Sequence, residues 1–116
     1  MSRGDIERIA RFERFLEQNP LTPLRIADLC AAVGVSQRTL HGVCVQHYGL
    51  SPVRYASLRR MQRARNALHA ADPALATVTA IATHHGFSEL GRFAVAYRAL
   101  FGEPPSATLR RPMTGA

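Results

Sequence analysis

The sequence carries one local pattern twice. Residues 29–36 read Leu-Cys-Ala-Ala-Val-Gly-Val-Ser and residues 81–88 read Ile-Ala-Thr-His-His-Gly-Phe-Ser, so glycine and serine recur at an offset of 52. One extra residue follows in the second copy, and the match continues at an offset of 53, for example from Gly49 to Gly102. Each copy predicts a short helix, a glycine turn, a serine cap and a longer helix. The repeat therefore predicts two helix-turn-helix units, with generic helical hairpins as the alternative.

Helix start and stop signals continue along the rest of the chain. No stretch alternates polar and apolar residues with period two, so the sequence predicts an all-α fold of seven helices. We expect an N-terminal helix-turn-helix subdomain over 1–50, a long linker helix within 51–71 and a C-terminal subdomain over 72–112, followed by a loose tail over 112–116. The predicted starts are Asp5, Thr22-Pro23, Ser36, Ser51-Pro52, Thr77, Ser88 and Pro104-Pro105.

The spacing of apolar residues predicts the buried face of each helix. The inward sets are Ile6, Ile9, Phe12, Phe15 and Leu16; Ile26, Leu29, Cys30 and Val33; Leu40, Val43, Cys44 and His47; Tyr55, Leu58, Met61, Ala64 and Leu68; Val78, Ile81, Ala82 and His85; and Phe93, Ala96, Tyr97, Leu100 and Phe101. Both cysteines fall in these sets, which favours structural thiols over a redox role. His84 and His85 are adjacent on a helix and point in different directions, which argues against a metal pair.

The charge is unevenly distributed. Fifteen arginines, no lysine and eight acidic residues give a net charge of +7, and all of the excess lies in residues 21–116. This indicates a polyanionic partner, with nucleic acid favoured over a membrane surface. No apolar run approaches the ~18 residues of a membrane span, and the N-terminus lacks a secretory apolar segment. With only two cysteines, a reducing cytoplasm is the expected location.

The predicted central helix has a length that suits two-site binding. From Pro52 to Ala70 it spans about 28 Å at ~1.5 Å per residue. Successive major-groove faces on one side of B-DNA lie about 34 Å apart. Such a helix could therefore hold both longer helices over neighbouring groove segments.

Several motifs together resemble one known family. They are Gly49-Leu50-Ser51-Pro52, Ile81-Ala82, Gly86-Phe87-Ser88, and Phe93 with Tyr97-Arg98 and Phe101-Gly102-Glu103-Pro104-Pro105. Over about residues 6–111 the chain resembles the DNA-binding domain of AraC/XylS-type bacterial transcription regulators. The resemblance implies two subdomains joined by a long helix. It also implies that the longer helix of each repeat copy, within residues 36–48 and 88–101, enters the major groove of promoter DNA; we call these two the reader helices. It also implies contact with RNA polymerase and an effector-sensing domain in a longer parent chain; whether this chain is stand-alone or a fragment stays open.

In the first reader helix, the resemblance places base contacts at Gln37, Arg38, His41 and Gly42. Arg38 is the strongest candidate, because its guanidinium can take guanine O6 and N7 together; a plain phosphate or solvent contact is the alternative. Gln37 could pair with adenine or lie on the backbone, and His41 could donate to a base. Gly42 removes a possible contact.

In the second reader helix, the candidate base readers are Glu89, Leu90 and Arg92. Arg92 is the most convincing of them. Glu89 could accept from cytosine N4 or only complement the helix dipole, and Leu90 could touch a thymine methyl group. Gly91 and Val95 stand where relatives often carry polar or arginine readers, so we expect this unit to discriminate less than the first.

Other polar side chains are candidates for contacts with the DNA backbone. About half of the linker-helix arginines are expected to face solvent or pair with acids instead. The candidates are Ser36, Thr39, Arg54, Arg60, Ser88 and Arg98, with Arg59, Arg63 and Arg65 as further linker-helix possibilities. No carboxylate pair, nucleophile–base arrangement or phosphate-binding glycine loop is present, so we expect no enzyme, cofactor or metal. The alternative function is a helical protein-interaction adaptor with an arginine-rich face.

Overall fold

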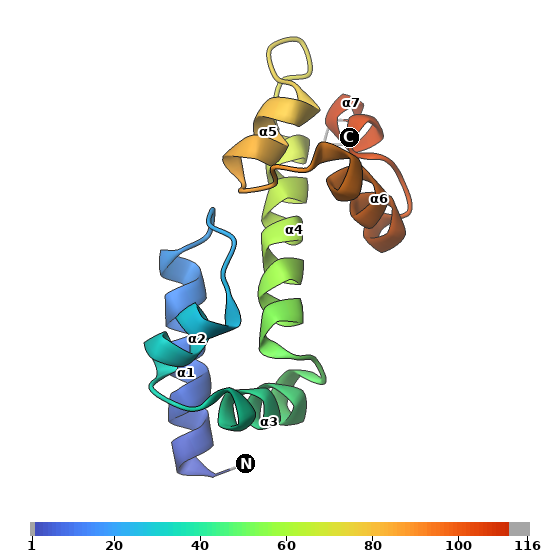
Figure 1. Ribbon diagram of the computed structural model, residues 1–116. Helices are drawn as coiled ribbons and strands as arrows, with labels where there is room; N and C mark the ends of the chain where they lie inside the picture. The colour runs from blue at the N-terminus through green and yellow to red at the C-terminus, as the bar shows by residue number, and fades with distance from the viewer. Residues whose placement is uncertain (1, 112–116) are drawn as a thin grey trace. The chain divides into compact units, whose positions relative to one another are not determined.

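The computed structural model describes residues 2–111, and the expected tail over 112–116 lies outside them. In this range all regular structure is helical, which confirms the predicted all-α class (Figure 1). The seven helices are α1 (Arg3–Gln18), α2 (Ile26–Val33), α3 (Gln37–Tyr48), α4 (Pro52–Ala70), α5 (Val78–His84), α6 (Leu90–Phe101) and α7 (Pro105–Arg110).

The chain divides into two compact units, Met1–Arg59 and Arg60–Ala116. The division falls inside α4, which begins at Pro52 and ends at Ala70 as its sequence signals predict. The helix supplies side chains to the core of each unit. The sequence interpretation instead treats 51–71 as a linker between domains, and that domain scheme stays a prediction.

The core of the first unit is built by α1, α2 and α3. Its fully buried members are apolar, and each buried large side chain stabilises the fold by roughly 1.5–3 kcal/mol. They are Phe12, Leu16, Leu29, Val33, Leu40 and Cys44. Two residues of the first unit that were expected to be buried are exposed instead. Ile6 is 58% exposed, and His47 is exposed while the next residue, Tyr48, packs against the cluster.

The turn of the first repeat copy forms as its sequence predicts. Gly34 adopts a φ of 79°, where a side chain would be strained, and its N–H donates to the carbonyl of Cys30 at 2.8 Å. The Oγ of Ser36 then caps α3 by accepting from the N–H of Thr39 at 3.2 Å. The helix-turn-helix geometry of this copy therefore follows from a glycine and a serine.

Two other predicted caps in the first unit are wrong. Asp5 lies in the first turn of α1 and donates its N–H to the Oγ of Ser2, which is the actual cap. The second helix begins at Ile26 rather than at Thr22-Pro23. Here the carboxylate of Asp28 accepts from the N–H of Arg25 at 3.0 Å, and this bond fixes a later start.

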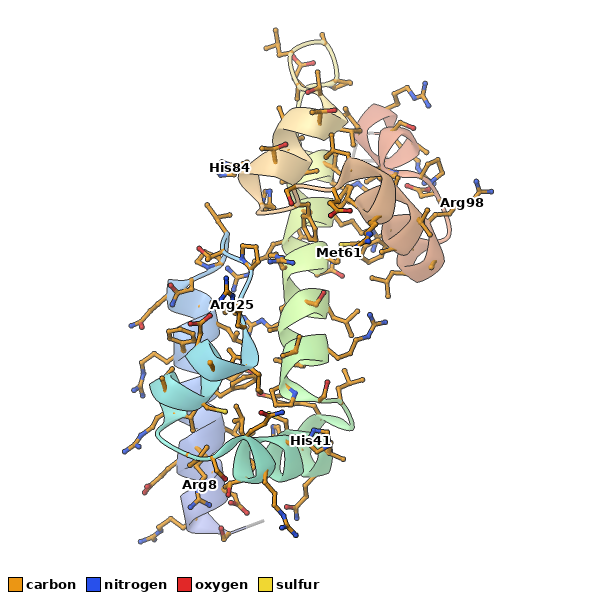
Figure 2. All side chains as sticks on the ribbon, in the orientation of Figure 1. Arg8, Arg25, His41, Met61, His84 and Arg98 are labelled. Carbon is orange, nitrogen blue, oxygen red and sulfur yellow. The ribbon has the colours of Figure 1, made fainter. Side chains whose placement is uncertain are left out.

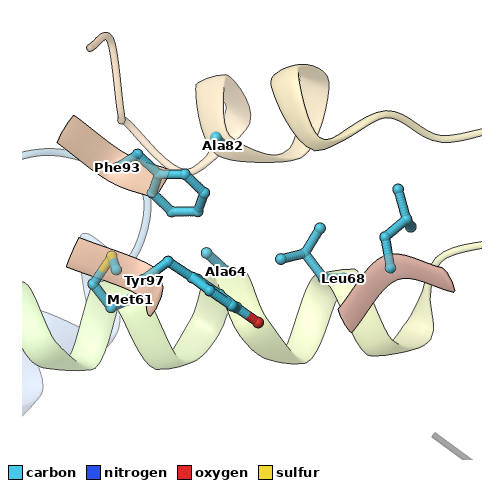
Figure 3. Close-up of a cluster of buried hydrophobic side chains, with 7 residues drawn as sticks. Met61, Ala64, Leu68, Ala82, Phe93 and Tyr97 are labelled. Atoms are coloured by element: carbon cyan, nitrogen blue, oxygen red, sulfur yellow. The ribbon is translucent and has the colours of Figure 1, made fainter. Parts of the chain in front are cut away.

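The second unit has its own core, in which α4 forms one wall (Figure 3). The buried members are Met61, Ala64, Leu68, Ala82, Phe93, Tyr97 and Leu109. The prediction for α6 is wrong at two positions, since Ala96 is exposed and Leu100 is 38% exposed. Phe93 and Tyr97 alone anchor this helix with fully enclosed side chains, and a wide face of α6 is left in solvent.

The turn of the second repeat copy differs from the first by one residue. Thr77 caps α5 as predicted by accepting from the N–H of Ala80 at 3.1 Å, and Gly86 adopts a φ of 86°. Ser88 does not cap α6, because the helix begins at Leu90 with Glu89 as its N-cap. The residue inserted in this copy shifts the helix start one position beyond the serine.

Candidate nucleic-acid interface

Helix α3 has one anchored face and one free face. Leu40, Val43 and Cys44 are buried and hold the helix on the first core. The opposite side carries four polar side chains, one glycine and one valine, all of them exposed, and Figure 2 labels His41 among them. The exposed set is Gln37, Arg38, His41, Gly42, Val45 and Gln46. The structure thus brings the first-helix base-reading candidates together on one surface.

At the N-terminal end of α3, some polar side chains have partners within the unit and others do not. Arg38 forms no ion pair with any acidic side chain within residues 2–111, so its guanidinium is available to a partner. Ser36 and Thr39, predicted as backbone contacts, are joined by a hydroxyl–hydroxyl bond of 3.1 Å. Thr39 is also half-buried, which fits a capping role better than a phosphate contact.

A polar network ties α3 to α1 and α4. The Glu13 carboxylate accepts hydrogen bonds from the hydroxyls of Tyr48 and Tyr55 and pairs with Arg59. The two tyrosine rings stack with their centroids 3.8 Å apart. Arg59 is therefore paired with Glu13, which is the alternative expected for about half of the linker-helix arginines. The network fixes the C-terminal end of α3.

Burial and charge shift the pKa values of these groups. Burial raises the pKa of Glu13, but hydrogen bonds from Tyr48 and Tyr55 and the charge of Arg59 outweigh it, so the net pKa is lowered. Burial and the hydrogen bond to Glu13 raise the pKa of Tyr48. Burial, assisted by the Glu13 charge, raises the pKa of Cys44 to about 11, so this thiol stays protonated and unreactive.

Helix α6 presents a different surface. Arg92 is 85% exposed and its Nε lies 3.1 Å from the carboxylate of Glu89, so two predicted readers contact each other. Leu90 is half-buried and packs against the second core, which removes it from the set of free readers. Val95 is 73% exposed, although it is not among the predicted base readers. The sequence feature that could have identified it is an apolar residue on the side of the helix opposite Phe93 and Tyr97.

The predicted backbone contacts fall into two groups. Arg54, Ser88 and Arg98 are exposed, and Figure 2 shows Arg98 on α6. Arg60 is half-buried, with its guanidinium carbon 4.5 Å from the centre of the Phe87 ring. Its Nε is buried without a hydrogen-bond partner among the described residues, and burial lowers its pKa. Arg60 thus packs within the second unit, and its contact with the DNA backbone stays a prediction.

The other linker-helix arginines and the histidine pair are placed as follows. Arg65 lies over the ring of Phe101 at 4.8 Å, and Arg63 is half-buried. His85 is buried as predicted, with its Nδ1 2.9 Å from the carbonyl oxygen of Ile81.

Within residues 2–111, no three His, Cys, Asp or Glu side chains gather as metal ligands. None of the described helices has the length and apolarity needed to cross a membrane.

A family model described as a helix-turn-helix domain matches residues 29–111, which include both repeat copies. A "Probable thc operon regulatory protein" of Rhodococcus erythropolis is 43% identical over 96 residues, covering 83% of this chain and 29% of that protein. A "XylDLEGF operon transcriptional activator" of Pseudomonas putida is 35% identical over 101 residues, covering 87% of this chain and 32% of that protein. The chain thus spans about a third of the length of these relatives.

Solved structures share the fold. A "probable AraC family transcriptional regulator" from Rhodopseudomonas palustris superposes with a TM-score of 0.77 at 41% identity, covering 90% of this chain and 95% of that one. An "AraC-type DNA-binding domain-containing" regulator from Chromobacterium violaceum gives a TM-score of 0.81 at 28% identity, covering 93% and 94%.

Proposed function

The chain belongs to the AraC/XylS family of helix-turn-helix transcription regulators, and we propose that α3 and α6 each enter the major groove of double-stranded promoter DNA. The family binds DNA and is not a family of enzymes. The observation that carries the proposal is the anchored geometry of α3. Three buried side chains hold one face, and the opposite face offers hydrogen-bonding groups with no partner inside the unit.

Arg38 is the principal base reader in this proposal. Its planar guanidinium is exposed and unpaired within residues 2–111, and it can donate to guanine O6 and N7 at once. Gln37 and His41 follow it on the same surface. Arg92 has the same chemistry on α6, where an exposed ion pair to Glu89 contributes little and can be exchanged for a base or a phosphate.

Phosphate contacts fall to the exposed cations near the reader helices. Arg54 lies at the start of α4 and Arg98 on α6, and each phosphate that they neutralise steepens the salt dependence of binding by about one unit of log–log slope. Ser88 is an exposed hydroxyl at the start of the second reader segment and can donate to a phosphate. Ser36 is also exposed, but its hydroxyl would have to exchange the hydrogen bond that it donates to Thr39 for one to a phosphate. Thr39 and Arg60 are left out, because both are engaged inside their units.

The activity of the whole protein is part of the proposal. The Pseudomonas putida relative is named a transcriptional activator, which supports activation as the mode of regulation. Contact with RNA polymerase is the route that we propose for it. An effector-sensing domain in a longer parent chain and action in the cytoplasm belong to the same proposal. The matches to DNA-binding regulators leave the protein-interaction adaptor without support.

Selection from random duplexes tests this function. We expect the protein to enrich a non-palindromic motif that covers two groove segments. Arg38→Ala should then weaken the preferred site by about 1–3 kcal/mol while hardly changing affinity for random duplex. Arg14→Ala is the matched control, because Arg14 is an exposed arginine that lines a hollow with residues of α1 and α2 and with none of the reader candidates. Failure to enrich any motif would overturn the proposal, and equal losses on both duplexes would make Arg38 a phosphate contact.

A further inference from the structure

We propose that Val95 recognises thymine by packing against its C5-methyl group, so that α6 selects a base by apolar contact. This inference rests on the proposed function, since α6 must enter the major groove. It assigns a role in base specificity to a residue whose side chain can form no hydrogen bond.

Val95 is an apolar side chain that its own unit leaves uncovered. At 73% exposed, it is the most exposed large apolar side chain in the described helices. Phe93 and Tyr97, two residues to either side, are buried, so Val95 points away from the core. Its neighbours one turn away are Gly91 and Ala99, both exposed, and a Cβ built at Gly91 meets nothing within 4 Å. The valine methyl groups therefore face away from the core of the unit.

Charged groups flank this apolar position on both sides. Arg92 and Arg98 lie three residues before and after Val95, and both are exposed. An apolar centre between two cations fits a polyanion that carries an isolated apolar group. In the major groove of DNA that group is the C5-methyl of thymine, which distinguishes thymine from the other bases.

The two repeat copies place different chemistry at this point. At the offset of 53, Val95 corresponds to Gly42, and His41 corresponds to Ala94. Beside its arginine, α3 offers an amide and an imidazole, whereas α6 offers, beside Arg92, mainly small residues and the more exposed of the two valines, Val95 at 73% against Val45 at 43%. Leu90, the other apolar candidate on α6, packs against the second core and leaves Val95 as the free one.

The side chain is also suited to contact at low entropic cost. A β-branched residue within a helix keeps essentially one χ1 rotamer, so the two methyl groups of Val95 have fixed directions. Ordering it against a base costs less than ordering a long flexible side chain. Covering one methyl group in this contact corresponds to about a fourfold change in affinity.

The test is a scan of the selected duplex with the full chain. Each thymine is replaced in turn by deoxyuridine, which removes only the C5-methyl, and Kd is measured. We expect about a fourfold loss at one or two positions in the half of the site that depends on Arg92. Val95→Ala should bind the thymine and uracil versions of those positions equally. Val45→Ala is the matched control, because it makes the same truncation on α3 at a valine 43% exposed, and it should keep the uracil penalty.

The outcomes separate this inference from the proposed function. A specific site with no uracil penalty in that half, or with no thymine there, overturns the role of Val95 and leaves DNA reading intact. A penalty that persists in Val95→Ala, or that disappears equally in Val45→Ala, also overturns it. Failure of the protein to select any site would remove the proposed function and this inference together.

Discussion

Gly42 lies in the interior of α3 without a structural reason to be glycine. Its backbone is helical with negative φ, and a Cβ added there would meet nothing within 4 Å. The position is exposed, so a methyl group would create no clash and fill no cavity. The main effect of Gly42→Ala is therefore to reduce the backbone conformational entropy that this position loses on folding. Glycine is less favourable than alanine in a helix interior by roughly 0.5–1 kcal/mol, so the variant should raise the free energy of unfolding by that amount.

Urea unfolding followed by circular dichroism measures this gain. For a unit of this size, about 1 kcal/mol corresponds to an increase in Tm of about 4–8 °C. Hydrogen exchange of the α3 amides places the gain in the first unit, because only openings that expose α3 should become rarer.

Gly34→Ala serves as the opposite control. Gly34 also has open space around its Cβ position, but its φ of 79° is strained for any L side chain. The same methyl group should therefore lower stability there by about 1–2 kcal/mol. If Gly42→Ala leaves stability unchanged or lowers it, or if both variants shift it in the same direction, the reasoning from backbone conformation is refuted.

Two further predictions concern the interior of the first unit. Glu13→Gln should lower the free energy of unfolding by about 1–3 kcal/mol, since it removes a charged acceptor shared by Tyr48, Tyr55 and Arg59. Because the pKa of Glu13 is lowered in the fold, its contribution is present above the unfolded pKa and disappears as the pH falls through the folded pKa. The advantage of wild type over the variant in urea titrations should hence shrink between about pH 6 and pH 3; an advantage independent of pH would contradict this. Cys44→Ser should destabilise by about 1–3 kcal/mol, because it places a hydroxyl in an apolar, fully buried position. A normal melting curve combined with lost DNA binding would show instead that Cys44 acts in recognition.

Local signals in the sequence predict most of the helices. Proline and serine at the start of α4, the caps Ser36 and Thr77, and the glycine turns all act within one turn of the chain, so their consequences are visible in the sequence. Where two local signals compete, the sequence alone does not decide. Thr22-Pro23 is a good start signal, but the bond from Arg25 to Asp28 lies closer to the apolar face that must be buried.

Burial was harder to predict at helix edges. Periodicity places His47 and Ala96 on inward stripes, whereas only residues that meet another helix are enclosed. In α3 the neighbouring Tyr48 reaches Glu13 and Tyr55 instead. The width of a buried stripe depends on which helices lie against it, and this is information about tertiary packing.

The candidate site shows the same limit. The exposed face of α3 follows from its apolar spacing, so Gln37, Arg38 and His41 could be assigned to one surface from sequence. Which arginines are free could not be assigned. Arg59 pairs with a residue 46 positions away, and Arg60 covers the ring of Phe87 in the turn between α5 and α6. Such partners are set by the fold and leave no local pattern.

Helix α4 belongs to both cores, and this determines how the chain can open. Tyr55 and Ala56 pack on the first cluster, whereas Met61, Ala64 and Leu68 lie in the second. If α4 unfolds from its C-terminal end, the core of the second unit loses contacts before that of the first unit. If it unfolds from Pro52, the core of the first unit loses contacts before that of the second. Limited proteolysis under mild destabilisation should accordingly yield fragments in which one reader helix has lost its support while the other remains protected.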